Sequence, residues 1–584
     1  MTIQADNGNN KIQSLNDTTI QVKGGILNII ANNGKNEIIA DKDKEIAIEA
    51  THDANIHIEG VNNSILGKIG ISVNGTQGKN EFPFVNMIAK GENGNNIINV
   101  ESQGILSNSA NINLEAKQNN IIKSQNIGIE AKGKNAIIKL IADKNNYINA
   151  KKGDGVYVEN GATVNIIAGD KDINWLTDYI DVDNIILSGD SALHTDSSGV
   201  INAIADHDNI IAGTNNGILS DGTGEINVTA GNNNYIGQYT DEEGNIHTSE
   251  NGINVSEGTV TVTSGNENYI YGIDNGIIAT GNNNIVNLSG KENNIIVKNI
   301  EGNATGINIK DRATINLNKD DGLDNQSVNI DVVSKNGNAI GIDVENNSTL
   351  KMDKPIGDLI INAEGTTSAT GIYVRQNDAP ININSNGNIV INAKSDDLSG
   401  SSGIVFSKSN GKIKANDNII INNVTNIEDI NKSEFGITIN NDSELILDSN
   451  LNIINGRKAI DVGKVAPVAG GSPNDDSKLD IVATSENGGN YITATENGIS
   501  VVNRKDSESM STVNLDGKNN IINIYANTNA GIVSGISSAD GAVINIGKKE
   551  DVIHSERTEI NVVNDINSKA SYIYMQFKLI EKVI

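Results

Sequence analysis

Three consecutive segments of this chain repeat one pattern: NNIINVESQGILSNSANINLEAKQ (residues 95–118), NNIIKSQNIGIEAKGKNAIIKLIADK (residues 119–144) and NNYINAKKGDGVYVENGATVNIIAG (residues 145–169). Each segment opens with Asn-Asn-x-Ile, continues with Gly before an aliphatic residue, and closes with small-x-aliphatic-x-aliphatic-x-small. The closing pattern recurs after 26 residues both times. A fixed period of this size is the signature of a repeat architecture.

The closing part of each segment alternates aliphatic and polar residues. In the first copy Ile112 and Leu114 fall on one face, while Asn113 and Glu115 fall on the other. A period of two is typical of a β-strand with one buried face. The Gly-aliphatic parts predict corners at which the backbone φ angle is positive. One repeat is therefore expected to hold three short strands joined by three turns.

A repeat of this size cannot bury its own apolar face, so neighbouring repeats are expected to stack. Each strand then pairs in parallel with its equivalent one repeat earlier. This predicts an all-β fold, a parallel β-helix (β-solenoid) with three short strands per coil. The prediction places Ile112, Ile138 and Val164 over one another in the interior. Asn stacks on Asn at the corners, where the side-chain amides bond to each other.

The pattern continues with longer steps over most of the chain, so we expect a continuous β-helix over residues 1–570. Five stretches leave the pattern and are expected to form loop excursions, where binding chemistry is often placed. They are residues 171–198, which include the only tryptophan, and residues 238–251, 352–358, 464–478 and 503–511. Residues 571–584 lose the Asn pattern and are interpreted as a cap on the last coil or as a truncated segment.

Composition limits the partners of the chain. The net charge is −29, aromatic residues make up 3% and cysteine is absent. An acidic chain is poorly suited to nucleic acid or an anionic membrane surface, because both attract Lys and Arg. Without cysteine there is no disulfide framework and no thiolate site. The first residues lack the basic and apolar regions of a signal peptide, and no apolar run approaches ~18 residues, so we expect no direct membrane insertion.

Groups that would converge on a reaction centre are not evident. The six histidines are scattered, and His52 and His57 lie close in sequence without a third ligand. Asp320, Asp321 and Asp324 form the best acidic cluster, which we interpret as a solvated turn rather than the carboxylate pair of a glycosidase. We therefore predict no catalytic residue, no metal site, no cofactor and no enzymatic activity.

One position of the repeat stands out. The residue x of Asn-Asn-x-Ile and its near variants is itself Ile or Tyr. If the following Ile points inward, x points outward, and stacking would line one flank with an Ile/Tyr stripe that is a candidate partner-contact surface. An alternative is that corner geometry or a loop covers these residues. The predicted stripe consists of Ile97, Ile121, Tyr147, Tyr235, Tyr269, Ile295, Tyr491 and Ile521.

The Asn-Asn-x-Ile, Gly-Ile and small-x-Ile-x-Leu repeats resemble the passenger region of monomeric autotransporter adhesins (type V secretion) of Gram-negative bacteria, over nearly the whole chain. The resemblance implies a right-handed β-helical stalk displayed at the cell surface, on the outer membrane, that mediates adhesion, autoaggregation or biofilm formation. The signal peptide and translocator barrel of that family lie outside this chain. The implied partners are a host or bacterial cell-surface glycan or protein, or a second copy of the chain.

Two other functions remain open at the level of sequence. Some β-helices are polysaccharide lyases or glycoside hydrolases, and such an enzyme would need carboxylates that converge at one coil level. The chain could also be a non-binding stalk of a larger surface protein. A fold by itself does not choose between these functions.

Overall fold

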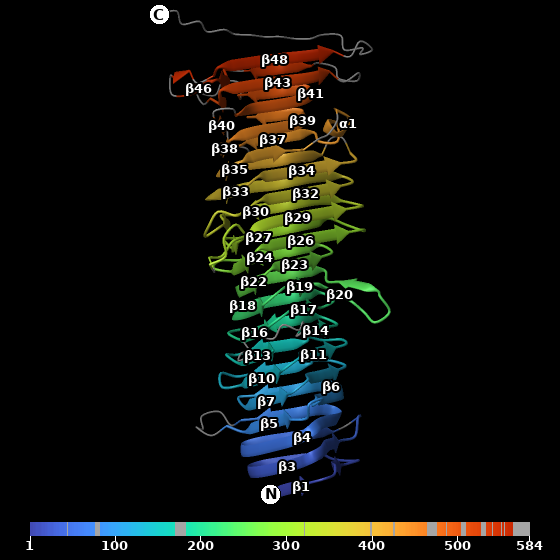
Figure 1. Cartoon of the computed structure of the whole chain (residues 1–584). Coiled ribbons are helices and arrows are strands. Elements are labelled where there is room, and N and C mark those ends of the chain that lie inside the picture. The colour runs from blue at the N-terminus through green and yellow to red at the C-terminus, as the bar shows by residue number, and fades with distance from the viewer. Residues whose placement is uncertain are drawn as a thin grey trace, which may run out of the picture. The chain divides into compact units, whose positions relative to one another are not determined.

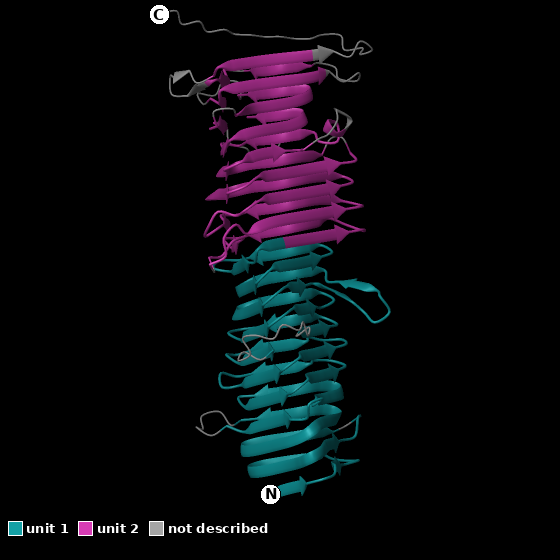
Figure 2. Ribbon diagram, in the orientation of Figure 1, with its two compact units in different colours: residues 1–293 teal, residues 294–584 magenta. Residues whose placement is uncertain are grey.

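The computed structural model describes all of the chain except residues 44, 76–81, 170–182, 321, 398–399, 424–426, 464–475, 486–487, 504–509, 527–532, 540, 550–551, 554 and 565–584. The described residues form two compact units, Met1–Asn293 (unit 1) and Asn294–Ile584 (unit 2), coloured separately in Figure 2. Each unit is a stack of coils built from parallel strands (Figure 1). The predicted parallel β-helix is therefore confirmed.

The first of three strand columns in unit 1 holds the closing pattern of the repeat. Each strand pairs in parallel with its equivalent in the next coil. The column runs through β1 (Thr2–Ala5), β3 (Ile20–Ile39), β4 (Ile46–Asn74), β5 (Phe84–Ala89), β7 (Asn111–Ala116), β10 (Ile137–Ala142), β13 (Thr163–Ala168), β16 (Val200–Ala205), β18 (Asn216–Ala230), β22 (Asn251–Ser264) and β25 (Ile285–Ser289).

The other two columns of unit 1 hold the Asn-Asn-x-Ile and the Gly-aliphatic segments. The long strands β6, β18 and β22 turn one corner and contribute to two columns, and β3 and β4 turn two corners and contribute to all three. The Asn column adds β2 (Asn10–Gln13), β6 (Asn96–Asn108), β8 (Asn119–Ser124), β11 (Asn145–Ala150), β14 (Asn184–Ser188), β17 (Asn209–Ala212), β19 (Asn234–Ile236) and β23 (Glu267–Gly272). The Gly column adds β9 (Ile129–Lys132), β12 (Val156–Glu159), β15 (Ser191–Thr195) and β24 (Asn275–Thr280).

The predicted interior stacking is present in detail. Ile138 pairs with Ile112 on one side and with Val164 on the other. All three side chains are at most 1% exposed. The same alternation of buried residues with exposed or half-exposed ones runs along β7, β10 and β13. The core of unit 1 is thus a set of aliphatic columns, each filled by equivalent residues of successive coils.

A continuous ladder of asparagine amides lies inside unit 1, buried beside the aliphatic columns. From Asn10 to Asn268, each Nδ2 donates to the Oδ1 of the equivalent Asn in the next coil, at 2.8–3.0 Å, and also to a backbone carbonyl of that coil. The ladder comprises Asn10, Asn36, Asn63, Asn96, Asn120, Asn146, Asn184, Asn209, Asn234, Asn268 and Asn293. The amides from Asn10 to Asn268 are tolerated in this apolar interior because each one finds its partners one coil away, and Asn293 ends the ladder by accepting from Asn268.

The glycines of the Gly-aliphatic segments do not turn corners by positive φ, so that expectation was wrong. Gly104, Gly128 and Gly155 have no φ in the left-handed region. A Cβ added at Gly128 would lie 2.5 Å from the Gly155 carbonyl oxygen and 2.6 Å from Cγ2 of Ile148. Glycine is required here because the backbone of the next coil and an interior isoleucine already occupy the space of a side chain.

Unit 2 repeats the three-column arrangement. One column runs through β27 (Ala304–Lys310), β30 (Asn338–Glu345), β33 (Ser368–Ser385), β35 (Ser401–Ala415), β37 (Phe435–Asn440), β39 (Leu451–Val462), β41 (Gly489–Val502) and β44 (Ser534–Ala539). A second adds β29 (Ser327–Ser334), β32 (Leu359–Gly365), β34 (Ile389–Ser395), β36 (Asn418–Ile421), β43 (Asn519–Ala526) and β48 (Arg557–Asn564). A third adds β28 (Thr314–Asn316), β31 (Thr349–Lys351), β38 (Glu444–Ser449), β40 (Lys478–Ala483), β42 (Thr512–Asp516) and β45 (Val543–Ile546). β26 (Glu292–Asn299) spans the boundary between the units.

The expected loop excursions have different outcomes. The described part of 171–198, from residue 183 onward, belongs to the regular β-helix, since β14 and β15 lie within it. Residues 238–251 contain an antiparallel hairpin, β20 (Gln238–Thr240) and β21 (Ile246–Thr248). In 352–358 no strand forms, but Ile356 is fully buried. Most of 464–478 and 503–511, and all of 571–584, lie outside the described residues, as does Trp175. Two further elements are α1 (Ile427–Ile430) and the β46–β47 hairpin (Lys548–Lys549 and Val552–Ile553).

Candidate binding groove

The outer face of the Asn column in unit 1 carries an unbroken row of large side chains. Register pairs connect each member to the next coil. We name this row the outer Ile/Tyr column; its members are Ile97, Ile121, Tyr147, Ile185, Ile210, Tyr235 and Tyr269. All seven are half-exposed, because the residues on either side of them point into the coil. The column includes five residues of the predicted stripe and two that the sequence search did not find.

Ile295 does not belong to the stripe. It is fully buried, and the half-exposed neighbour is Ile296. The reason is register: Asn268 bonds to Asn293, so Asn293 is the ladder residue and Asn294 occupies the outer position. In unit 2, Tyr491 pairs with Ile521, and both are half-exposed.

The β20–β21 hairpin leaves the coil beside this column (Figure 1). Its turn is closed by Asp241, whose Oδ1 accepts the N–H groups of Glu243 at 3.1 Å and Asn245 at 2.8 Å. Gly244 has a φ of +85°, which the turn requires and which glycine adopts without strain. At the base of the hairpin the Ser249 hydroxyl donates to the Gly213 carbonyl at 2.5 Å. The hairpin is therefore fixed at both its tip and its base.

A groove of about 1230 Å³ lies between the hairpin and the coil face. The coil side is lined by outer-column residues and by the neighbouring outward positions, among them Lys123, Asn149, Leu187 and Tyr271. The hairpin side is lined by the segment from Gln238 to Glu243. The volume exceeds the few hundred Å³ typical of a small-molecule pocket, and the lining mixes apolar walls with a few polar groups.

Four tyrosine rings line the groove: Tyr147, Tyr235 and Tyr271 on the coil side and Tyr239 on the hairpin side. The Tyr235 and Tyr269 rings lie 5.2 Å apart and are parallel to within 4°. Tyr271 lies beside Tyr269 in the same orientation, with ring centroids 6.2 Å apart. On the hairpin, Tyr239 stacks on the His247 ring at 4.7 Å. The four lining tyrosines thus bring apolar rings and hydroxyl groups to the groove, in a chain whose aromatic content is only 3%.

The carboxylates that line the groove all come from one wall. They are Asp241, Glu242 and Glu243, at the turn of the hairpin. Hydrogen bonds from His247 and Asn245 lower the pKa of Asp241 to about 2, so this carboxyl is ionised at neutral pH. Burial raises the pKa of Tyr239 and Tyr271, which keeps both phenols neutral and able to donate hydrogen bonds. The opposite wall contributes Lys123 and Lys151 as its charged groups.

The other candidates from the sequence are not brought together. His57 contacts Glu59 and Asn86, whereas His52 contacts the Thr51 hydroxyl. Asp320 pairs with Lys354 at 2.7 Å, and Asp324 lies 3.8 Å from the same ammonium group; Asp321 is outside the described residues. This turn therefore holds a lysine between its acids, which fits the solvated-turn interpretation.

His194, on β15, lies between two aspartates. Its Nδ1 lies 2.9 Å from Asp154 and its Nε2 lies 3.0 Å from Asp221, with the Tyr157 ring edge-on at 4.9 Å. Burial lowers the pKa of His194, but the hydrogen bonds and charges of the two aspartates outweigh it and leave the pKa above its usual value.

A raised pKa in the folded state means that this histidine stabilises the fold below about pH 6.5 and loses that contribution as the pH rises through the folded pKa. We expect the free energy of unfolding of unit 1 to fall over that range, and the His194→Gln variant to lose the pH dependence. Urea titrations at several pH values measure it. His52→Gln is the control and should behave as the parent. An identical pH slope in parent and His194→Gln would contradict the assignment.

Sequence reasoning missed part of the groove for identifiable reasons. Ile185 and Ile210 follow Asp-Asn rather than Asn-Asn, so a search for Asn-Asn-x-Ile passed over them. Tyr271 occupies the next outward position after Tyr269, which a two-residue step along the strand would have revealed. Tyr239 lies on the hairpin, and no repeat periodicity predicts where an excursion folds back.

Comparisons with known proteins add no relative: the chain matches no family model, no curated protein and no solved structure. Within the described ranges, no helix has the length and apolar character needed to cross a membrane. The groove must therefore be interpreted from its own chemistry.

Proposed function

We propose that this chain is a non-enzymatic, surface-exposed adhesin of a Gram-negative bacterium, whose β-helix binds a cell-surface glycan through the groove under the β20–β21 hairpin. The observation that carries the proposal is the set of four tyrosines, beside polar side chains, that line that groove. The apolar faces of sugar rings pack on aromatic rings, and hydroxyl, amide and ammonium groups bond to sugar hydroxyls. The cell-surface location follows the resemblance of the repeats to autotransporter passengers.

The arrangement of charges supports binding rather than cleavage. A glycosidase places two carboxylates on either side of the scissile bond, about 5–5.5 Å apart in retaining enzymes and ~6.5–9.5 Å apart in inverting ones. Here the lining carboxylates share one turn of the hairpin, and the facing wall offers lysines. A bound glycan would therefore meet acids on one side only.

The test is binding of the full chain to an array of bacterial and host cell-surface glycans, followed by titration with the best ligand. Tyr235→Ala and Tyr271→Ala should each weaken binding at least about tenfold, because each removes a ring from the groove wall. Tyr491→Ala is the matched control, since Tyr491 occupies the equivalent outward position in unit 2 and does not line the groove. Its affinity should equal that of the parent.

The outcomes separate the alternatives. Release of new reducing or unsaturated ends from a bound glycan would show that the protein is a glycan-cleaving enzyme rather than an adhesin. Clumping of cells that display the chain, unaffected by Tyr235→Ala but abolished by Ile121→Asp, would assign function to self-association along the outer Ile/Tyr column. Absence of both glycan binding and clumping would overturn the proposal and leave a non-binding stalk as the remaining function.

A further inference from the structure

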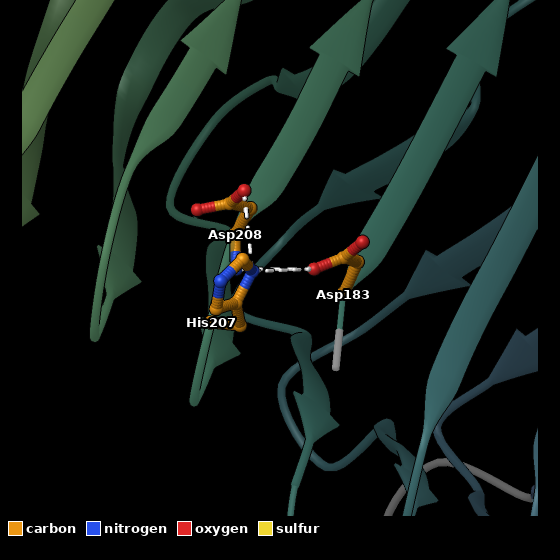
Figure 3. Close-up of side chains that lie close together, drawn as sticks. All are labelled: Asp183, His207 and Asp208. Carbon is orange, nitrogen blue, oxygen red and sulfur yellow. Dashed lines mark hydrogen bonds and ion pairs between the residues drawn. The ribbon is translucent and has the colours of Figure 1, made fainter. Parts of the chain in front are cut away.

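We propose that Asp183, His207 and Asp208 form a binding site for a divalent transition-metal ion, with Zn²⁺ as the best fit (Figure 3). The site lies in unit 1, at the start of β14 and β17, and it is independent of the proposed glycan binding. The two aspartates precede ladder residues of consecutive coils, and the histidine precedes the second aspartate. The sequence predicted no metal site, because residues 25 positions apart become neighbours only when the coils stack.

The three candidate ligands already lie close together. His207 Nδ1 lies 3.4 Å from Asp183 Oδ1 and 3.2 Å from Asp208 Oδ2. The three candidate ligand atoms all lie within 4.8 Å of one another. In a tetrahedral Zn²⁺ site with bonds of about 2.0–2.1 Å, neighbouring ligand atoms are separated by about 3.3–3.4 Å. The two measured separations match that edge, and the half-buried environment keeps the side chains in place.

The aspartates also stand where other coils of unit 1 place asparagine. There the Oδ1 of the residue before the ladder Asn accepts the backbone N–H of the next coil, as Asn119 does for Asn145 at 3.2 Å. Asp183 accepts the N–H of Asp208 at 3.2 Å, and Asp208 accepts the N–H of Asn233 at 2.8 Å. One neutral oxygen is enough for this bond. The carboxylates therefore add a second oxygen and a negative charge that the stacking does not require.

That added charge is unfavourable without a cation. Two stacked carboxylates in a chain of net charge −29 repel each other. An ion of charge +2 between them would offset this repulsion and leave the backbone bonds intact.

The donor set selects the class of metal. Ca²⁺ and Mg²⁺ prefer sites made of oxygen atoms alone, whereas an imidazole nitrogen suits Zn²⁺ and its first-row neighbours. Asn232 Nδ2 donates to Asp208 Oδ1 at 3.0 Å and so orients the carboxylate whose other oxygen faces His207. Three protein ligands leave a fourth tetrahedral position open.

The experiment uses the full chain, stripped of metal with a chelator and titrated with Zn²⁺ against a chromophoric indicator. We expect one saturable equivalent, and substitution by Co²⁺ should give the intense visible absorption of a tetrahedral centre. His207→Gln and Asp208→Asn should each weaken Zn²⁺ binding at least about tenfold. Asp208→Asn retains the oxygen that accepts the Asn233 N–H, so loss of binding in this variant does not report misfolding.

The matched control is His194→Gln. His194 also lies between two aspartates, but its Nδ1 contacts Asp154 and its Nε2 contacts Asp221. The two carboxylates therefore lie on opposite sides of the ring, and one metal ion could not bind both of them and a ring nitrogen. This variant should bind Zn²⁺ as the parent does. Absence of a saturable equivalent, equal affinity in Asp208→Asn and parent, or tighter binding of Ca²⁺ than of Zn²⁺ would each overturn the assignment.

Discussion

Replacing Asn146 by alanine should destabilise unit 1 by about 3–5 kcal/mol, because a buried amide at the middle of the ladder is lost. Asn146 is fully buried. Its Nδ2 donates to Asn184 Oδ1 at 3.0 Å and to the Ile167 carbonyl at 2.8 Å, and its Oδ1 accepts from Asn120 at 3.0 Å. The substitution leaves three groups without their partner where water does not reach, and each costs about 1–3 kcal/mol less any local relaxation.

Asn146→Asp should be at least as damaging, although it conserves size. An oxygen replaces the donor Nδ2 and faces two acceptors, and a negative charge is placed in the interior. Hydrogen exchange of β8, β11 and β14 measures the effect locally, and urea unfolding measures it for the whole chain. Because coils couple mainly to their neighbours, exchange should rise most within these strands.

Asn202→Ala is the control for the ladder. Asn202 also takes part in a chain of amides, accepting from Asn227 at 3.0 Å and donating to Asn165 at 2.9 Å. It is half-exposed, so water replaces the lost bonds and the cost should stay below about 1 kcal/mol. Equal losses in Asn146→Ala and Asn202→Ala would refute the claim that burial makes the ladder important.

The Gly128→Ala variant should lose about 1–3 kcal/mol or more of stability, because its methyl group has no room. The obstacles are the Gly155 carbonyl and the Ile148 side chain, one coil away. A backbone carbonyl in a stacked coil cannot move without displacing its own hydrogen bonds, so β9 and β12 must separate. Thermal and urea unfolding report the loss, and hydrogen exchange should show it concentrated at these two strands.

Gly8→Ala is the control for Gly128→Ala, because it replaces a glycine by alanine at a position where the added methyl group meets no neighbour. A Cβ at Gly8 would meet nothing within 4 Å, and the φ angle there is not in the left-handed region. This variant should be neutral or slightly stabilising, since alanine restricts the unfolded chain more than glycine does. If Gly128→Ala were as mild as Gly8→Ala, the close approach of consecutive coils at Gly128 would not be a constraint.

The fold could be predicted because the sequence repeats one pattern of strands and turns many times. The period-two pattern around Ile112 identifies a strand, and the 26-residue step to Ile138 identifies its partner. In an ordinary domain the partner of a strand is unknown, whereas in a repeat it is the next copy. The same logic failed at Gly128, where sequence suggested a turn and the cause was packing against the next coil.

The groove was predictable only in part. The outer position of Tyr147 and Tyr235 follows from alternation along a strand. Ile295 was assigned to the wrong face because two adjacent asparagines allow two registers, and the one used by the structure is fixed by the bond from Asn268 to Asn293. The direction in which the hairpin folds back over the coil depends on contacts such as Ser249 with Gly213, which no periodicity contains.

The one-way direction of the Asn ladder bears on how unit 1 changes length in evolution. Every step of the ladder uses a donor on one coil and an acceptor on the next, so each coil presents an acceptor on one side and a donor on the other. Duplicating or deleting one whole coil, such as residues 119–144, therefore joins a donor to an acceptor as before. An insertion that shifts the ladder residue by one position would instead leave an amide facing an aliphatic side chain. Gene variants of different length should thus differ by complete coils. Any insertion that is not a whole coil should lie in a loop outside the strands.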